Sequence, residues 1–475
     1  MYIPNAVPTF KMLHHDHCRK IHLTSLELLR RSGVRVHHPE ALRLLKETDA
    51  LITDENLVRF PPALVDWALS QAPQRITLCR RGTDAPALLM ENMETNFGTG
   101  SDCQNYLDPK TGEHRLFTTP EIIDCIRLVD ALPELRFCMS MGEPSEIEGH
   151  RRFCHQFSLM IEHTVKPIVF IAGGRRDCEL IVAMAAAAAG GEEALRLNPT
   201  LLSYSQVTTP LVQPEESLAK LLFMAEKGLP TVHMPSPMMG GTAPVTMPGA
   251  LALGNAEVLS SLVIHQLKRT GAPFVYGNGV HPMDMKTSIS VYGGPEFVLA
   301  RAAGAEMARY YHLPHFGYAA HTDSCVMDEQ AATDAVFSIL IAMMTGQHLT
   351  HDVGYMEAGL MTSPEYIVFA AEIISMMGSF TQGLSFDPES LATDLINQVG
   401  PGGNYIANSH TFKHFRELWQ PTLFNRDRRS KWLAKGGARL GQRLRDKTIG
   451  IIESHRPEPL AESVREEIQY ILKQR

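Results

Sequence analysis

The sequence of 475 residues contains only eight cysteines, and no two of them form a CxxC pair. This scattered pattern excludes a disulfide framework and a zinc site of paired thiolates, and it is typical of reduced cytoplasmic proteins. Long apolar runs are also absent, since 181–191 and 336–346 fall short of the ~18–20 residues that span a membrane. Residues 1–20 lack the basic and apolar regions of a secretory signal. We therefore expect a cytoplasmic protein that does not enter a membrane.

An excess of positive charge is missing too. Lys and Arg number 44 against 52 Asp and Glu, a net charge of −8, which argues against a basic nucleic-acid binder. Apolar residues make up 44% of the sequence, which is ample for a large core. One stretch departs from this balance, because residues 426–447 hold nine basic and two acidic residues. It is either a solvated helix face or a docking patch for an acidic partner protein.

Cofactor and metal signatures are absent as well. The segment Gly98-Thr99-Gly100 lacks the third glycine of a dinucleotide loop, and neither a G-x-x-x-x-G-K-[ST] nor a D-x-H-x-x-G corrinoid motif occurs. We therefore expect no cofactor bound on this chain and no metal site. The adjacent side chains of residues 14–18 (HHDHC) do not converge well on one ion. A zinc barrel without an H-E-x-x-H motif remains an alternative, with His233, His321, His348 and His351 as ligands.

From residue 93 onward, short β-branched or apolar runs alternate with longer helical patterns. Eight such units predict an α/β fold of the (β/α)8 TIM-barrel type over 93–384. A doubly wound sheet is the weaker alternative, because no G-x-G-x-x-G follows the first strand. Helical extensions are expected at 1–92 and 385–475. The expected strands are 95–98, 137–141, 167–171, 201–207, 230–235, 273–277, 315–320 and 348–353.

A barrel of this type carries its active site at the carboxyl ends of the strands. Aromatic residues gather at these positions, and their ring faces suit a quaternary ammonium, which has no N–H to donate. Any single aromatic there is more often a core residue, so only their concentration favours a function. The candidates for binding are Phe97, Tyr106, Gln206, Tyr276, Asn278 and Tyr355, and those for catalysis are His321, Asp323 and His348.

Six separated blocks resemble the trimethylamine methyltransferase family, and they occur in order over nearly the whole chain. The resemblance implies a (β/α)8 protein that moves a methyl group from an amine to the cobalt of a separate corrinoid protein. The blocks are GVRVHHPEAL (33–42), GGTAPVTMPGALALGNAEVL (240–259), FVYGNGVHPMDMKT (274–287), HTDSCVMDEQ (321–330), SPEYIV (363–368) and VGPGGNYIANSHTFKHFRELWQP (399–421).

One departure from the family narrows the substrate. Archaeal trimethylamine enzymes of this family carry pyrrolysine in the barrel, whereas this chain has ordinary residues near His321. The resemblance is therefore to the non-pyrrolysine branch, which implies a quaternary amine: glycine betaine, or else proline betaine, carnitine or γ-butyrobetaine. It also implies cobalamin supplied by a corrinoid partner protein, and it leaves a homo-oligomer open. The ammonium would be caged by the rings of Phe97, Tyr106, Tyr276 and Tyr355. The carboxylate would be bound, or water ordered, by His348, His321, Asn278 and Gln206.

The chemistry agrees with this departure. Cobalt(I) attacks a methyl carbon by in-line displacement, and a quaternary ammonium already carries the positive nitrogen that leaves as a neutral amine. Positioning and electrostatics then suffice, and orientation alone can supply up to ~7–11 kcal/mol of the barrier. A zinc-dependent barrel enzyme and a non-catalytic betaine-binding protein are the alternatives from other classes.

Overall fold

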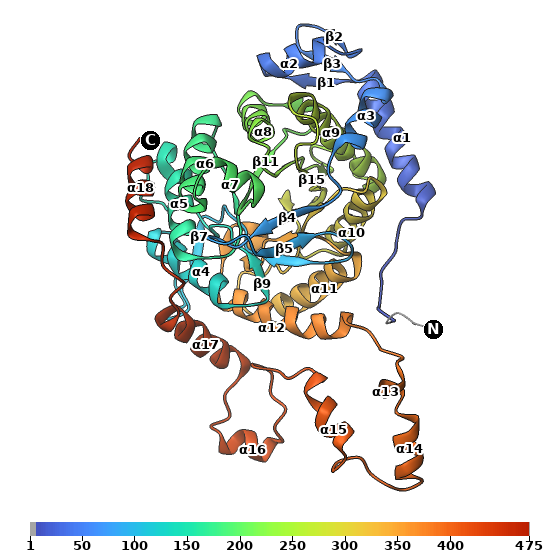
Figure 1. Cartoon of the computed structure of the whole chain (residues 1–475), viewed down its shortest axis with the longest axis vertical. Coiled ribbons are helices and arrows are strands. Elements are labelled where there is room, and N and C mark those ends of the chain that lie inside the picture. The colour runs from blue at the N-terminus through green and yellow to red at the C-terminus, as the bar shows by residue number, and fades with distance from the viewer. Residues whose placement is uncertain (1–5, 475) are drawn as a thin grey trace.

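Eight short parallel strands form a barrel at the centre of the computed structural model, which describes residues 6–474 (Figure 1). The first five residues of the expected N-terminal extension and the last residue of the C-terminal one lie outside that range. A bridge between Cys138 and Ile168 joins the two ends of the sheet. The predicted (β/α)8 barrel is confirmed, and each strand overlaps the run expected for it. In spatial order the strands are β10 (Ile168–Phe170), β11 (Leu201–Gln206), β13 (Thr231–Met234), β15 (Phe274–Gly277), β18 (His315–Tyr318), β19 (Leu349–His351), β6 (Asn96–Gly98) and β9 (Leu135–Phe137).

Side chains on these strands alternate between the barrel interior and the surrounding helices. On β18, Phe316 and Tyr318 point inward, and their register partners on β19 are Leu349 and His351. The residues between them face the helices. This parity decides which residues near a strand end belong to the barrel interior.

Helices follow the strands and cover the barrel. Proline in the first turn and glycine at the carboxyl end mark several boundaries, as in α10, which begins at Pro295, and α11, which ends at the left-handed Gly346. Ser363 caps α12 by accepting a hydrogen bond from the Tyr366 backbone N–H. The helices are α4 (Thr119–Ala131), α5 (Gly149–His163), α6 (Arg175–Ala189), α7 (Glu192–Leu197), α8 (Glu215–Lys227), α9 (Met247–Lys268), α10 (Pro295–Tyr310), α11 (Glu329–Thr345) and α12 (Pro364–Thr381).

Helix α9 is long and apolar enough to cross a membrane by composition, but 83% of that stretch is buried inside the protein. It packs against the barrel on one side and against α1 (His15–Arg31) and α3 (Pro62–Gln71) on the other. The polar side chain of Asn255 within it bonds to Ser25 and Tyr311. Helix α9 is therefore a core helix, apolar all round because it is covered all round.

The N-terminal segment is less helical than expected. Besides α1, α2 (Pro39–Lys46) and α3, it contributes three strands to a small sheet and a hairpin to the barrel. The sheet has the order β12 (Val212–Gln213), β1 (Val34–Val36), β3 (Leu57–Arg59) and β2 (Leu51–Thr53). Strands of three residues are too short to show an alternating pattern, so the sequence alone could not reveal them.

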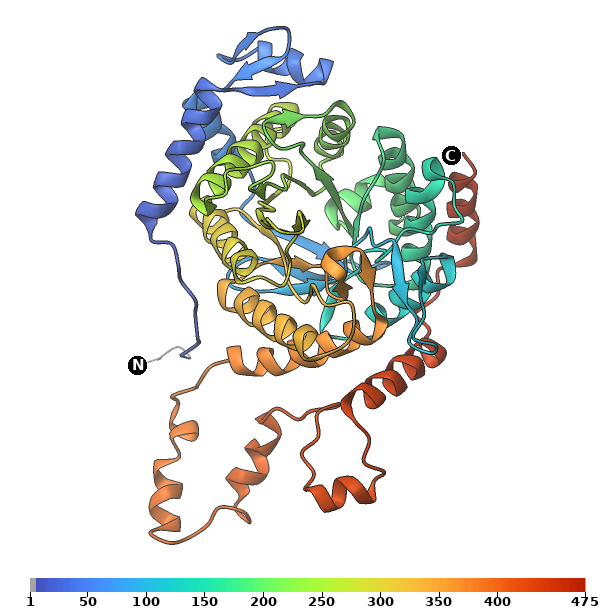
Figure 2. The same cartoon turned by 180° about the vertical axis from the view of Figure 1, so that it is seen from behind.

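The hairpin of β4 (Ile76–Cys79) and β5 (Pro86–Met90) closes the amino-terminal end of the barrel. Ile76, Leu78 and Leu88 pack into the same cluster as the inward residues of the barrel strands. Figure 1 looks onto this hairpin, and Figure 2 looks onto the opposite, open end of the barrel.

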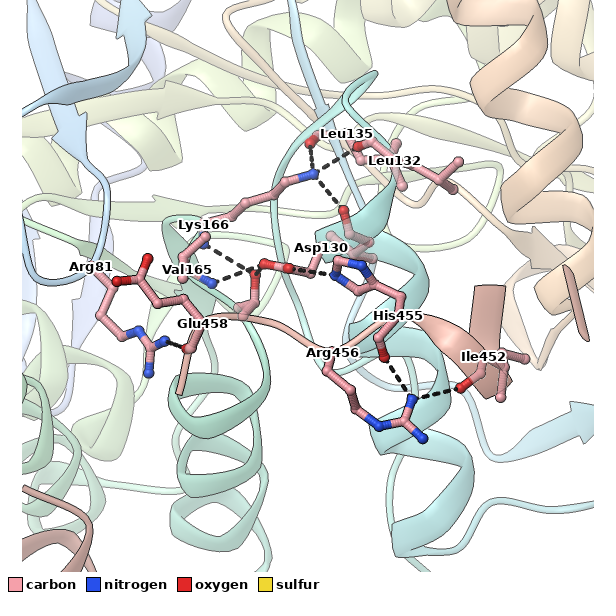
Figure 3. Close-up of polar contacts among 12 residues, drawn as sticks. Arg81, Asp130, Leu132, Leu135, Val165, Lys166, Ile452, His455, Arg456 and Glu458 are labelled. Carbon is pink, nitrogen blue, oxygen red and sulfur yellow. Dashed lines mark hydrogen bonds and ion pairs between the residues drawn. The ribbon is translucent and has the colours of Figure 1, made fainter. Parts of the chain in front are cut away.

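Two C-terminal helices pack against the barrel helices. Helix α17 (Leu440–Ser454) lies on α4 and α12, and α18 (Glu462–Leu472) lies on α5 and α6. Between them, the His455 ring bonds to the Asp130 carboxylate at 2.7 Å, and Arg81 donates to the Glu458 carbonyl (Figure 3). Lys166 donates to three backbone carbonyls around the end of α4, and burial lowers its pKa to about 8. The chain end is thus fastened by side chains from distant segments.

Residues 382–439, called the C-terminal arm below, project sideways from the barrel in both views (Figures 1 and 2). Only α17 and α18 meet the expectation of a helical extension packed on the barrel. The basic residues at 443–447 are used inside the chain: Arg443 donates to the Leu423 carbonyl and Arg445 pairs with Glu365. The arm holds the short helices α13 (Pro388–Leu391), α14 (Thr393–Val399), α15 (Ser409–His414) and α16 (Arg429–Ala434), with a turn of 3₁₀ helix after α15.

Candidate active site at the carboxyl ends of the barrel strands

Aromatic rings cluster at the carboxyl ends of the barrel strands around two histidines. The His351 ring lies 4.2 Å from Tyr318 and 4.4 Å from Phe316, ring centre to ring centre, and Tyr204 stacks on Phe316 at 5.5 Å. A second group is edge-on, because Phe297 lies 4.8 Å from the His321 ring. Tyr292 joins this group. We call Tyr204, Tyr292, Phe297, Phe316, Tyr318, His321 and His351 the aromatic cluster.

A buried guanidinium belongs to this cluster. The Cζ of Arg301, on α10, lies 4.8 Å from the ring centres of both Phe297 and Tyr318. One of its nitrogens donates to the Val280 carbonyl, whereas its Nε has no hydrogen-bond partner within the described residues. Burial lowers the pKa of Arg301. The protein thus already places one cation against the ring faces of the cluster.

The two histidines of the cluster retain unused nitrogen atoms. Within residues 6–474, neither ring nitrogen of His321 has a hydrogen-bond partner. The Nε2 of His351 has none either, although both residues are buried. The Nδ1 of His351 lies 2.6 Å from the Asp352 carboxylate. Burial lowers the pKa of His321 to about 4, so its imidazole is neutral near pH 7. Buried polar atoms without partners are uncommon, and here they favour a polar ligand.

Asp102 and Tyr355 form a hydrogen-bonded network beside the cluster. The Tyr355 hydroxyl donates to Asp102 Oδ1 at 2.6 Å and accepts from the backbone N–H groups of Ser101 and Asp102 at 2.6 and 3.0 Å. Asp102 remains accessible to solvent although protein surrounds it. That enclosure raises the pKa of its carboxyl, while the hydrogen bond from Tyr355 opposes the rise. The network fixes a carboxylate at the open end of the barrel.

Backbone geometry at the strand ends brings these groups together. Gly100 has no side chain where one would collide, since a Cβ there would lie 2.2 Å from Cζ of Tyr355. Ala320 and Asp352 have φ angles of +59° and +74°, in the left-handed region that residues with a side chain seldom adopt. Such strained turns directly after β18 and β19 are typical of functional sites.

Four of the residues predicted from sequence lie at this end of the barrel. His321 is a member of the cluster, and Tyr355 holds Asp102. Gln206 is exposed, and its Nε2 donates to the Tyr204 hydroxyl at 2.5 Å. The Asp323 carboxylate accepts from the backbone N–H groups of Tyr292 and Gly293 at 2.8 and 3.0 Å. Asp323 therefore holds the backbone of Tyr292 and so helps to position the Tyr292 ring of the cluster.

The structure places four other predicted residues outside the barrel interior, which corrects the expectation that they face a substrate. Tyr276 points outward, and its hydroxyl donates to Asn255 on α9. Asn278 donates to the Leu251 carbonyl of the same helix. Phe97 packs in the core between the barrel and its helices, and Tyr106 packs against Phe117 in the hairpin after β6. Their parity on the strand, or their place in a hairpin, excludes them from the interior.

His348 lies at the wrong end of its strand for the expected role, because it precedes β19 and so sits at the amino-terminal end of the barrel. Its Nδ1 accepts from the His315 backbone N–H, and its Nε2 bonds to the Asn92 carbonyl. It lines a cavity of about 420 Å³ at that end. His351, three residues later, is the histidine that reaches the aromatic cluster.

The alternative zinc site is not assembled. His233 bonds to Ser205 on β11 and to Gln213 on β12, on the outer side of the barrel, while His348 and His321 occupy opposite ends of the barrel. Within residues 6–474, no three His, Cys, Asp or Glu side chains gather closely enough to hold a metal ion.

The open end of the barrel is rimmed by apolar side chains. They come from the loops that follow β13, β15, β18, β19 and β6, which are neighbours in the barrel, so they border one side of the open end. An exposed apolar rim of this kind is typical of a protein-binding surface. Its members are Leu116, Val245, Met285, Ile289, Val326 and Leu360.

Comparisons with known proteins agree on one family. The family model described as trimethylamine methyltransferase (MTTB) matches residues 1–475. The chain is 30% identical to the trimethylamine methyltransferase MttB of Desulfitobacterium hafniense strain DSM 10664 / DCB-2, over 96% of this chain and 92% of that protein. It is 28% identical to the glycine betaine methyltransferase of Desulfitobacterium hafniense strain Y51, over 99% of this chain and 98% of that protein.

Among solved structures, the monomethylamine methyltransferase MtmB of Methanosarcina barkeri is similar in fold. The TM-score is 0.54 at 10% sequence identity, with 94% of this chain and 88% of that chain covered. This likeness supports the barrel architecture.

Proposed function

The chain belongs to the trimethylamine methyltransferase family, and we propose that it demethylates glycine betaine, passing the methyl group to Co(I) of a separate corrinoid protein. The cobalt electron pair forms the bond to the methyl carbon, the carbon–nitrogen bond breaks, and its pair stays on the nitrogen of dimethylglycine. No proton needs to move. The observation that carries this proposal is the aromatic cluster, in which ring faces adjoin unpaired imidazole nitrogens and a guanidinium.

The trimethylammonium end of betaine would lie against the rings of Tyr204, Phe316 and Tyr318. A cation over an aromatic face gains ~0.5–2 kcal/mol per ring when water is excluded. The carboxylates of Asp102 and Asp352 add a negative potential, since both lie close enough to act on neighbouring groups of the cluster. This environment favours a fixed positive charge that cannot be lost by deprotonation.

The carboxylate end of betaine finds donors in the same cluster. Arg301 has an unpaired Nε, and His321 has two unpaired ring nitrogens, one of which carries a proton in the neutral ring. A bare trimethylamine would leave these buried donors without partners, at a cost of about 1–3 kcal/mol each. Arg301 and His321 therefore favour a betaine over a simple methylamine.

The methyl acceptor would approach over the apolar rim. Because cobalt must reach the methyl carbon in line, the corrinoid protein has to cover the open end of the barrel. The rim residues, such as Met285 and Val245, are exposed there and available for that contact. The proposal places cobalamin on the partner protein and the reaction in the cytoplasm.

The direct test mixes the purified chain with its Co(I) corrinoid protein and glycine betaine. We expect the absorbance of Co(I) to be replaced by that of methyl-Co(III), with dimethylglycine formed in equal amount. Trimethylamine, carnitine, proline betaine and γ-butyrobetaine serve as parallel substrates. If methyl-Co(III) forms with trimethylamine but with none of the quaternary amines, the assignment of a betaine is rejected. If it forms with none of the five compounds, catalysis is rejected.

A ring deletion tests the site itself. Tyr318→Leu should raise the dissociation constant of glycine betaine by about 2- to 30-fold, the equivalent of one cation–π contact. The matched control is Tyr310→Leu, because that ring lies on the outer side of α10, next to α1. Equal affinities of wild type and Tyr318→Leu by calorimetry would remove the cluster from the binding site.

A further inference from the structure

The C-terminal arm has almost no interior of its own. Among residues 382–439, all of which the structure describes, Leu423 alone is buried. Its four helices have between four and seven residues, far fewer than the ~12–15 that an isolated helix needs to be stable in water. Something other than the arm itself must therefore stabilise it.

The arm is anchored to α12 near its middle, and at its start Leu384 pairs with the backbone of Ala6. The Glu372 carboxylate on α12 accepts from the backbone N–H groups of Thr422 and Leu423, both at 2.9 Å, and Trp419 donates to Ser375. This anchor divides the arm into two parts, which we call the apolar loop (382–418) and the basic loop (425–439).

The apolar loop exposes large side chains along its length. Polar contacts hold its shape, since Glu389 pairs with Lys413 and with His414, while the apolar side chains point to solvent. With Leu433 of the basic loop, ten large apolar side chains are between 40% and 87% exposed. A standard interface buries ~800 Å² of each partner. The nine in the apolar loop are Leu384, Phe386, Leu391, Ile396, Tyr405, Ile406, Phe412, Phe415 and Leu418, with Ile406 87% and Phe412 75% exposed.

The two loops carry opposite charge. The apolar loop has four acidic and two basic residues, whereas the basic loop has six basic residues and one acidic residue. Around a two-fold axis, a patch on the axis meets its own copy, whereas a patch away from the axis meets a different patch of the other chain. A surface with both signs of charge can therefore be complementary to itself. The apolar loops then meet at the axis, and each basic loop faces the acidic residues of the other chain.

We propose that the C-terminal arm is a dimerisation device, in which the arms of two copies of this chain pack against each other around a two-fold axis. The arm leaves the side of the barrel, so this contact leaves the open end with the aromatic cluster free (Figure 2). The proposal is independent of the substrate, because no residue of the cluster takes part.

The first test is the mass of the full-length chain by light scattering. We expect an even multiple of the 52.7 kDa of one chain. The double variant Ile406→Asp, Phe412→Asp should halve that mass or reduce it to a monomer. Leu197→Asp is the control, because Leu197 is 63% exposed on α7 but lies outside the arm. A monomeric wild type, or a double variant of unchanged mass, would overturn the proposal.

Charge reversal gives a second test that does not depend on a destabilising substitution. One variant carries Asp394→Lys and Glu417→Lys in the apolar loop, which changes its net charge from −2 to +2. The other carries Arg428→Glu, Arg429→Glu and Arg439→Glu in the basic loop, which changes its net charge from +5 to −1. Each alone should associate more weakly than wild type, since both of its charge contacts become repulsive.

Mixing the two variants should restore association, because each reversed patch then meets a patch of opposite sign. A mixture that stays monomeric while wild type is dimeric contradicts the pairing of the two loops. If wild type is monomeric and the arm instead binds the corrinoid protein, the second-copy assignment is wrong.

Discussion

Replacement of Tyr355 by Phe removes one oxygen atom from the centre of the Asp102 network. The Ser101 N–H loses its partner in a buried place, and the Asp102 N–H loses its partner where water can replace it. An unsatisfied buried donor costs about 1–3 kcal/mol, so the free energy of unfolding should fall by that amount. The Tyr355 hydrogen bond also holds down the pKa of Asp102, and its loss should raise that pKa.

The functional consequence is a shifted pH profile. In the proposed reaction, ionised Asp102 helps to hold the ammonium, so betaine affinity falls as pH drops through the pKa of Asp102. Tyr355→Phe should move this fall to higher pH, measured by calorimetry across a pH series. Tyr276→Phe is the matched control, because its hydroxyl also makes a buried hydrogen bond, to Asn255, but on the outer side of the sheet. Identical profiles for wild type and Tyr355→Phe would refute the link between the network and the cation.

Three further outcomes are expected. Burial raises the pKa of Glu257 from 4.5 to about 7, so the folded state favours the protonated carboxyl. The free energy of unfolding should therefore fall by about 3 kcal/mol as the pH rises from ~4.5 through ~7. Urea unfolding of the variant Glu257→Gln should not show this dependence on pH. Gly100→Ala should push the Tyr355 ring aside and weaken betaine binding in calorimetry, whereas Gly149→Ala, with no atom within 4 Å of its Cβ, should not. Asp130→Ala should release the segment after α17 to limited proteolysis, because His455, Thr164 and the Val165 N–H all bond to Asp130.

Much of the barrel could be predicted from the sequence, because strand and helix signals recur with a regular spacing. The periodicity was weaker where elements are short. Strands β1 to β3 have three residues each, and β1 pairs with the distant segment β12, where Arg35 lies opposite Val212. No local pattern reports such a pairing.

The site was harder to predict than the fold because the face of a residue depends on strand register. Tyr276 and Tyr318 both lie near the ends of barrel strands, yet Tyr276 points outward and Tyr318 inward. A shift of one residue in the assumed strand reverses that assignment. The aromatic pair Phe316 and Tyr318, spaced by two, was the signal that could have identified an inward face. Arg301 lies on a helix, outside any rule about strand ends.

His348 and His351 show the same limit along the strand. Three residues of β-strand span ~10 Å, which separates the closed end of the barrel from the open one. The sequence places both histidines in one run, and only the observed bounds of β19, Leu349–His351, tell them apart. The C-terminal arm differs again, because its apolar residues predict a buried segment that this single chain does not bury.

The balance of charge in the aromatic cluster explains how one site could both bind a betaine and release its product. Two carboxylates, those of Asp102 and Asp352, and one guanidinium, that of Arg301, act on the cluster, while the low pKa of His321 keeps its ring neutral. A betaine adds an ammonium on the side of the rings and a carboxylate on the side of Arg301, so both of its charges find opposite partners. When the methyl group leaves, the nitrogen becomes neutral and the attraction to the rings and carboxylates is lost. In the proposed reaction, the transfer itself would therefore weaken the binding of dimethylglycine, and its release would require no proton donor.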